Sequence, residues 1–271
     1  MGGVVLRSGG RIATLLYVAL LTGCSSVDTL QGQVLDVFGK PVAGATIAIK
    51  GQSSHVLADT RGTFSIEVTR GAPLDLMAGK EGFVRDKLSL ELPESEDEDE
   101  KLPRAEFRLF PEPDAKGFYG LGYRALVALP MSKIHEVGSE LEVVHGVRDI
   151  PDILLGPTTE PHQILFSTSL RHDEIARLDL KLFRLEFAEK QTLKGVTGPM
   201  ESTVELWLPL EEIPFELRGL LTREIYLITT KAKLESGMYA FADQGTLSRQ
   251  EVGSLVRLSE EMRQAHVFEV K

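Results

Sequence analysis

Strict alternation of polar and apolar side chains marks the segment Thr63-Phe64-Ser65-Ile66-Glu67-Val68. Phe64, Ile66 and Val68 share one face of an extended chain, so the segment predicts a β-strand with one buried face. Similar runs lie on both sides of it, and turns rich in Gly, Pro and Asp separate them. The other predicted strands are 31–37, 41–49, 74–78, 87–92 and 104–110, with turns at 38–41 and 59–62. Short strands at this spacing predict a β-sandwich.

The turn residues of this region follow an ordered pattern. It consists of Gly32-x-Val34-x-Asp36, Gly39-x-Pro41-Val42-x-Gly44-Ala45-x-Ile47, Asp59-x-x-Gly62-x-Phe64 and Gly82-Phe83. The pattern resembles the carboxypeptidase regulatory-like domain, a transthyretin-like β-sandwich. Such domains are accessory modules of zinc carboxypeptidases, outer-membrane receptors and adhesive surface proteins. The resemblance implies a domain of this family at residues 30–111, and it implies a fold more than an activity.

A dense acidic run interrupts the first domain. Six of the seven residues at positions 94–100 are Asp or Glu. Side chains of like charge at this density favour a solvated loop, and we expect a hairpin loop between the strands at 87–92 and 104–110. A calcium site is the weaker interpretation, because the run lacks glycine-punctuated ligand spacing. Pro111 and Pro113 mark the linker that follows.

A second β-rich domain is expected at residues 115–271. Its predicted strands are 123–130, 163–166, 176–185, 204–208, 224–228, 237–241 and 266–270, with an edge-type strand at 212–217 that Pro214 interrupts. The glycine-rich segment 116–123 favours a strand or turn with aromatic packing over a nucleotide-binding loop. Residues 248–262 suggest a short helical excursion near the C-terminus. The expected fold class is therefore all-β, with two β-sandwich domains.

The first twenty-four residues have the order of a secretory signal. Arg7 and Arg11 precede the apolar run 12–21, which is too short to span a bilayer. The run ends in Leu21-Thr22-Gly23-Cys24, which resembles the bacterial lipobox. The resemblance implies cleavage after residue 23, diacylglycerol on the Cys24 sulfur and a fatty acyl chain such as palmitate on the new amino terminus. Residues 24–29 would be the tether, and Ser25 resembles an address for the outer rather than the inner membrane.

Charge and cysteine content narrow the possible partners. The formal net charge is −10, and a product that starts at Cys24 keeps 28 basic and 40 acidic side chains, a charge of −12. Such a chain repels nucleic acid and anionic headgroups, so we expect no nucleic-acid partner and membrane contact through lipid alone. Cys24 is the only cysteine, which excludes disulfides within the chain.

The sequence motifs that could indicate catalysis lack the residues or the spacing that the chemistry requires. The only His-x-x-Glu pair is His266 with Glu269, too close to the C-terminus to be followed by the second His of a zinc carboxypeptidase. No Gly-x-Ser-x-Gly elbow occurs. His135, His145, His162 and His172, the last beside Asp173, have no standard metal-ligand spacing, so they would form a site only by converging in space.

These observations predict a lipid-anchored protein of the cell envelope with a non-enzymatic binding or structural role. We expect a protein or glycan partner and no cofactor or metal. One alternative is a hydrolase or metal-dependent enzyme whose residues converge from 135–175. Another is an accessory factor for envelope assembly or secretion.

Overall fold

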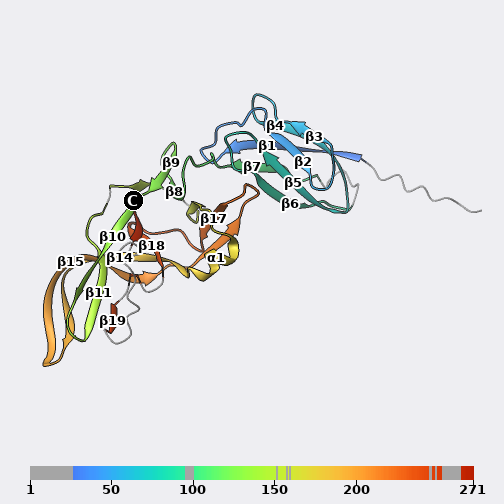
Figure 1. Ribbon diagram of the computed structural model, residues 1–271. Helices are drawn as coiled ribbons and strands as arrows, with labels where there is room; N and C mark the ends of the chain where they lie inside the picture. Colours follow the sequence, from blue (N-terminus) through green and yellow to red (C-terminus); the bar gives the residue numbers. More distant parts are fainter. Residues whose placement is uncertain are drawn as a thin grey trace, which may run out of the picture.

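The fold was analysed in a computed structural model (Figure 1). The structure describes residues 27–94, 101–150, 152–156, 158, 160–243, 246–247, 249–251 and 264–271. The predicted signal segment 1–23, Cys24 and positions 95–100 of the acidic run lie outside the described residues. Within the described part, no helix has the length and apolar character needed to cross a membrane. The prediction of an all-β fold is confirmed.

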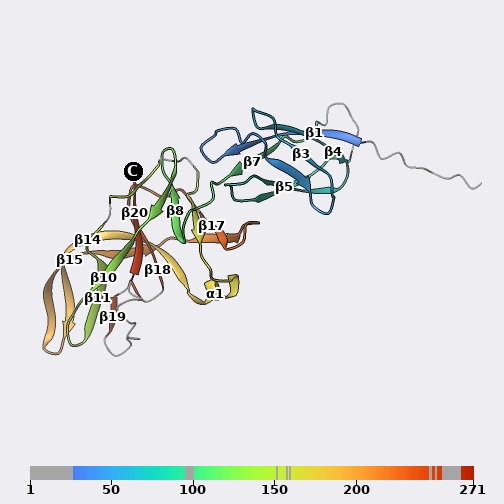
Figure 2. The same ribbon diagram turned by 45° about the horizontal axis from the view of Figure 1, so that its top comes forward.

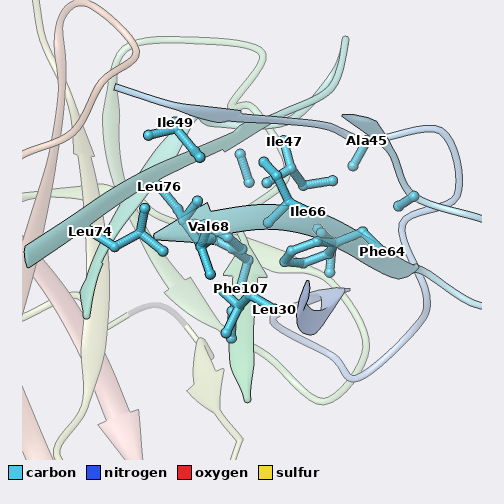
Figure 3. Close-up of a cluster of buried hydrophobic side chains, with 14 of the residues drawn as sticks. Leu30, Ala45, Ile47, Ile49, Phe64, Ile66, Val68, Leu74, Leu76 and Phe107 are labelled. Atoms are coloured by element: carbon cyan, nitrogen blue, oxygen red, sulfur yellow. The ribbon is translucent and has the colours of Figure 1, made fainter. Parts of the chain in front are cut away.

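The first module, β1–β7, consists of two sheets. In the described part of the chain their strand orders are β4-β1-β7 and β3-β2-β5-β6. The strands are β1 (Val27–Asp36), β2 (Thr46–Ile49), β3 (His55–Leu57), β4 (Thr63–Thr69), β5 (Pro73–Gly79), β6 (Asp86–Glu91) and β7 (Ala105–Leu109). Their inward side chains form one apolar core between the sheets (Figure 3). Phe64, Ile66 and Val68 are all buried there, as the alternation predicted.

Two turns of this module are held by aspartates. The Asp36 carboxylate accepts hydrogen bonds from the backbone N–H groups of Phe38 and Lys40, at 2.9 and 2.8 Å. Asp59 does the same for the backbone of Arg61 and Thr63, both at 2.8 Å. These side-chain hydrogen bonds add to the backbone bonds that close the same turns, from the Asp36 N–H to the Lys40 carbonyl at 2.7 Å and from the Asp59 N–H to the Thr63 carbonyl at 2.9 Å.

The connection after β6 corrects one prediction. We expected the acidic run to close a hairpin, but β6 and β7 belong to different sheets. β7 pairs in parallel with β1, from Gly32 opposite Ala105 to Asp36 opposite Leu109. The chain therefore crosses between the sheets after Glu91, because the free edge of β1 is where the apolar face of β7 can join the core. The short strand β3 was not predicted.

The second module, β8–β20, contains a five-stranded sheet of order β16-β17-β13-β8-β9 in its described residues. The strands are β8 (Gly117–Leu121), β9 (Leu126–Leu129), β13 (Gln163–Ser167), β16 (Phe215–Gly219) and β17 (Ile225–Thr230). The glycine-rich segment is thus a strand with aromatic packing, as expected, because Phe118 stacks on Phe166 with ring centroids 4.2 Å apart. Pro214 directly precedes β16, which forms one edge of the sheet.

The larger sheet of this module closes on itself. Its described pairings run β10-β11-β15-β14-β18-β20, and β20 also pairs with β10. β12 and β19 attach to β20 and β11. The strands are β10 (Met131–Gly138), β11 (Glu142–Val147), β12 (Leu154–Leu155), β14 (Leu180–Gly195), β15 (Gly198–Glu212), β18 (Gly237–Asp243), β19 (Arg249–Glu251) and β20 (Gln264–Val270). Ile134, Val147, Leu185, Ala240 and Val267 form a core on one face of this ring.

An aromatic core joins the ring to the five-stranded sheet. The centroid of the Phe241 aromatic ring lies 4.9 Å from that of Phe118, and 6.0 Å from those of Phe215 and Phe268. Phe118 and Phe215 come from the five-stranded sheet, whereas Phe241 and Phe268 come from the ring. This packing holds the five-stranded sheet against one side of the closed sheet.

Several segments of this module differ from the sequence-based predictions. β10 and β11 were not predicted, and of the predicted strand 123–130 only Leu126–Leu129 forms a strand, β9. The predicted strand 176–185 begins only at Leu180, because α1 (His172–Arg177) precedes it. The Glu174 side chain accepts the Arg171 backbone N–H at 2.8 Å, which caps α1, and Ile175 anchors it in the core. Of the expected helical excursion 248–262, the structure describes 249–251, which form β19; its other residues lie outside the described part.

The modules meet through the second face of the five-stranded sheet. Val84 and Phe110 of the first module pack against Leu165, Ile225 and Leu227. This explains why β13 and β17 are apolar on both faces and do not alternate. The contact joins one end of the first module to the second, and both views show this arrangement (Figure 1 and Figure 2).

Candidate functional site

A cleft of about 700 Å³ lies between the two modules, within the range of small-ligand sites. Segments far apart in the sequence form it, namely the β1–β2 turn, β6, β7, the β8–β9 turn, the approach to β13, and β16. Its lining residues are Val37, Phe38, Gly39, Asp86, Glu106, Arg108 and Phe110 from the first module, and Leu121, Gly122, Tyr123, Leu155, Gly156, Thr158, Glu160, Pro161, His162, Gln163, Arg218 and Leu227 from the second.

Ion pairs supply planar polar groups to the cleft. Arg218 of β16 donates to Asp86 of β6 at 2.9 Å, so this pair bridges the modules. Arg108 donates to Glu106 at 2.9 Å on β7. All four side chains are partly exposed, so each retains hydrogen-bonding capacity toward the cleft beyond its ion pair.

Aromatic side chains line the cleft from both modules. Tyr123 lies in the β8–β9 turn, which the Gly122 N–H closes by donating to the Ala125 carbonyl at 3.0 Å. The Tyr123 residue is 67% exposed, which leaves its ring available to a ligand rather than to the core. Phe38 lies in the β1–β2 turn and is half-buried. The cleft therefore combines aromatic surface with carboxylate and guanidinium groups.

His162 forms part of the cleft wall and is only 5% exposed. Its ring nitrogen Nδ1 accepts the Leu234 backbone N–H at 3.3 Å, so the proton of the neutral ring must be on Nε2. Burial, with a smaller contribution from the charge of Lys233, lowers the pKa of His162 below its usual value. Nε2 is buried and has no hydrogen-bond partner among the described residues.

The histidines do not converge. His135 lies opposite Gly146 and His145 opposite Glu136 in the β10–β11 pairing, so the two rings point to opposite faces. His145 Nε2 lies 3.3 Å from Glu136 Oε2. His172 begins α1 and stacks on Tyr226, and His162 lies at the cleft. Across the residues that the structure describes, no group of three or more His, Cys, Asp or Glu side chains is placed to hold a metal ion. The convergence required by the enzyme alternative is thus not observed there.

The His266–Glu269 pair is part of a structural strand. His266 lies in β20, where its Nδ1 is 2.7 Å from the Leu129 carbonyl oxygen and its ring packs on Phe118. Burial lowers the pKa of His266, although the hydrogen bond to Leu129 opposes this effect. Glu269 is three residues on in the same strand and points to the opposite face. The interpretation of 266–270 as a terminal strand is confirmed.

The cleft residues were not identified from the sequence. Tyr123 belongs to a segment whose pattern is difficult to interpret, and Asp86 and Arg218 are separated by 132 positions. The one available signal is an aromatic beside the glycines at 120–123, which also fits ordinary packing.

Comparisons with known proteins do not assign this chain to a family. No family model matches the chain, and no curated protein matches it. Among solved structures, the chain is similar to a proposed carbohydrate-binding protein from Bacteroides uniformis, with 10% sequence identity over 79% of this chain and 86% of that chain. The TM-score is 0.22. A likeness this weak assigns neither fold nor function.

Proposed function

We propose that this chain is a lipid-anchored protein of the bacterial cell envelope that binds a carbohydrate in the cleft between its two modules and has no catalytic role. The observation that carries the proposal is the exposed Tyr123 beside the Asp86–Arg218 and Glu106–Arg108 pairs. The same cleft is bordered by apolar side chains such as Phe110 and Leu227.

The chemistry of a sugar matches this cleft. The C–H face of a pyranose ring packs against an aromatic face, whose negative quadrupole attracts the weakly positive hydrogens. Vicinal hydroxyl groups donate to carboxylates and accept from guanidinium groups, which the two ion pairs present.

We also propose that the first module belongs to the family that its turn pattern resembles, the carboxypeptidase regulatory-like domain. Its two sheets and the positive φ angles of Gly39, Gly44, Gly62 and Gly82 support this, because the quoted pattern places glycine at each of these turns. In our proposal it serves as the accessory module that carries one wall of the cleft.

The anchor is tested by Cys24→Ala. A chain without the sulfur nucleophile cannot receive diacylglycerol, so we expect it to leave the membrane fraction almost completely. Detergent fractionation and mass spectrometry of the mature protein measure this. Ser26→Ala, which leaves the cysteine in place, should remain in the membrane fraction. Membrane association of Cys24→Ala equal to that of the control would disprove the anchor.

Ligand binding is tested with neutral oligosaccharides of about four to six units, from cello-, xylo-, malto- and chito-series, by titration calorimetry. We expect at least one series to bind, and Tyr123→Ala to weaken that binding about fivefold, since an aromatic contact is worth about 1 kcal/mol. The control is Phe187→Ala, which removes a similarly exposed ring from β14, outside the cleft. The proposal fails if none of the series binds, or if both variants bind as the parent does.

A further inference from the structure

We propose that the anchored chain stands end-on at the membrane, with the first module as a spacer. The end of that module at Val27 faces the bilayer, and the ligand cleft faces away from it. This inference rests on the anchor of the proposed function. It concerns the surface that meets the lipid and the location of the ligand, which the anchor alone does not determine.

The membrane-facing end follows from the start of β1. Val27 is the third residue after Cys24, so three residues of extended chain place it within about 10 Å of the lipidated sulfur. β1 is held firmly from its first residue, since Val27 pairs with Thr69 and Asp28 forms an ion pair with Arg70. The predicted tether 24–29 was too long, because residues 27–29 already belong to β1, and the shorter connection keeps the module close to the membrane surface.

The cleft lies at the other end of the same strand. β1 runs for ten residues without interruption, and at about 3.3 Å per residue its ends are about 30 Å apart. The turn that follows it contributes Val37, Phe38 and Gly39 to the cleft. The second module packs at this end, through Val84 and Phe110. Both views show β1 beginning at the end of the first module remote from the second module (Figure 1 and Figure 2).

At the near end, Arg70 is paired with Asp28 and Lys50 with Asp75, so both cations are already partnered by carboxylates. The β4–β5 turn at this end brings Gly71 beside Glu94, where the Gly71 N–H donates to the Pro93 carbonyl at 3.2 Å. Glu94 opens the acidic run of the sequence. The formal charge of −12 expected for the mature chain likewise opposes adhesion of its sides to anionic lipid. Acyl chains at Cys24 are then the single attachment, and the cleft meets glycans beyond the membrane surface rather than lipid headgroups.

The orientation is tested by resonance energy transfer to a labelled lipid, measured from a donor dye at each of two positions in turn. Cys24 is blocked by its lipid, so an added cysteine is the only free thiol of the mature protein. Ser54→Cys places a donor dye at the near end, where Ser54 is exposed and borders the same groove as Val27. Lys40→Cys places it at the far end, on the exposed residue next to Gly39 of the cleft. The lipidated variants are reconstituted in phosphatidylcholine vesicles that contain an acceptor-labelled lipid.

We expect transfer from position 54 to be several-fold more efficient than transfer from position 40. Equal efficiencies, or a higher efficiency at 40, would overturn the end-on orientation while leaving the anchor intact. Flotation of the same samples reports the anchor separately. Protein that does not float with the vesicles would overturn both the anchor and the orientation that rests on it.

Discussion

Phe241→Ala should destabilise the second module by about 3–5 kcal/mol, the cost of removing a buried phenylalanine. Phe241 is fully buried, and its ring contacts Phe118, Phe215 and Phe268 across both layers of the module. Deleting it leaves a cavity between the ring of strands and the five-stranded sheet, which neighbouring backbones cannot close. The only tryptophan, Trp207, lies in the same module, so urea denaturation followed by tryptophan fluorescence measures the loss.

The control for this prediction is Phe187→Ala. Phe187 is 57% exposed, and its ring packs against Trp207, with centroids 5.6 Å apart. We expect a loss below about 1 kcal/mol, because little apolar area is removed from a packed environment. Equal losses for the two variants would show that the aromatic core does not hold the two layers together.

The first module was predictable because most of its strands have one buried face. β4 and β5 alternate between buried and less buried residues along their whole length. Alternation of this kind is visible in a sequence without any knowledge of the partner strands. The aspartates and glycines of its turns act within a few residues, so their signals are also local.

The second module was less predictable because not all of its strands have one buried face and one exposed face. In β13 the residues Ile164 to Ser167 are all buried, since the sheet packs on the first module as well as on the ring. In the segment 176–180 the sequence alternates as a strand would, but the chain does not form one. Leu178 and Leu180 suggest an apolar strand face, yet Leu178 is 38% exposed and Asp179 has a φ of +47° at the exit from α1. The cap formed by Glu174 and the tertiary contact of Ile175 together favour a helical turn there.

The candidate site could not be predicted from the sequence because its residues meet only through the packing of two modules. Asp86 and Arg218 pair because Val84 and Phe110 dock on β13 and β17. No spacing rule links such positions. The parallel pairing of β7 with β1 was missed for the same reason, since adjacency in the sequence favours a hairpin between neighbouring strands.

Gly32→Ala should cost the first module about 3 kcal/mol, at the upper end of the range for overpacking. Gly32 lies in β1 between β4 and β7, and a Cβ there would lie 2.3 Å from Phe64 Cζ and 2.5 Å from the Ala105 carbonyl oxygen. The phenylalanine ring could shift, but the carbonyl belongs to the parallel pairing of β1 with β7. The clash therefore strains the backbone contact that joins β7 to the core.

A matched variant separates this clash from the general cost of replacing glycine. Gly44 has a φ of +71°, and a methyl group added there would have no atom within 4 Å, so Gly44→Ala loses only about 1 kcal/mol through its left-handed conformation. Thermal denaturation monitored by circular dichroism compares the two variants. If Gly44→Ala is as destabilising as Gly32→Ala, the close approach of β7 to β1 is not what requires glycine at position 32. If the difference is observed, the first glycine of the quoted pattern is needed for strand packing, whereas Gly44 is needed for a turn.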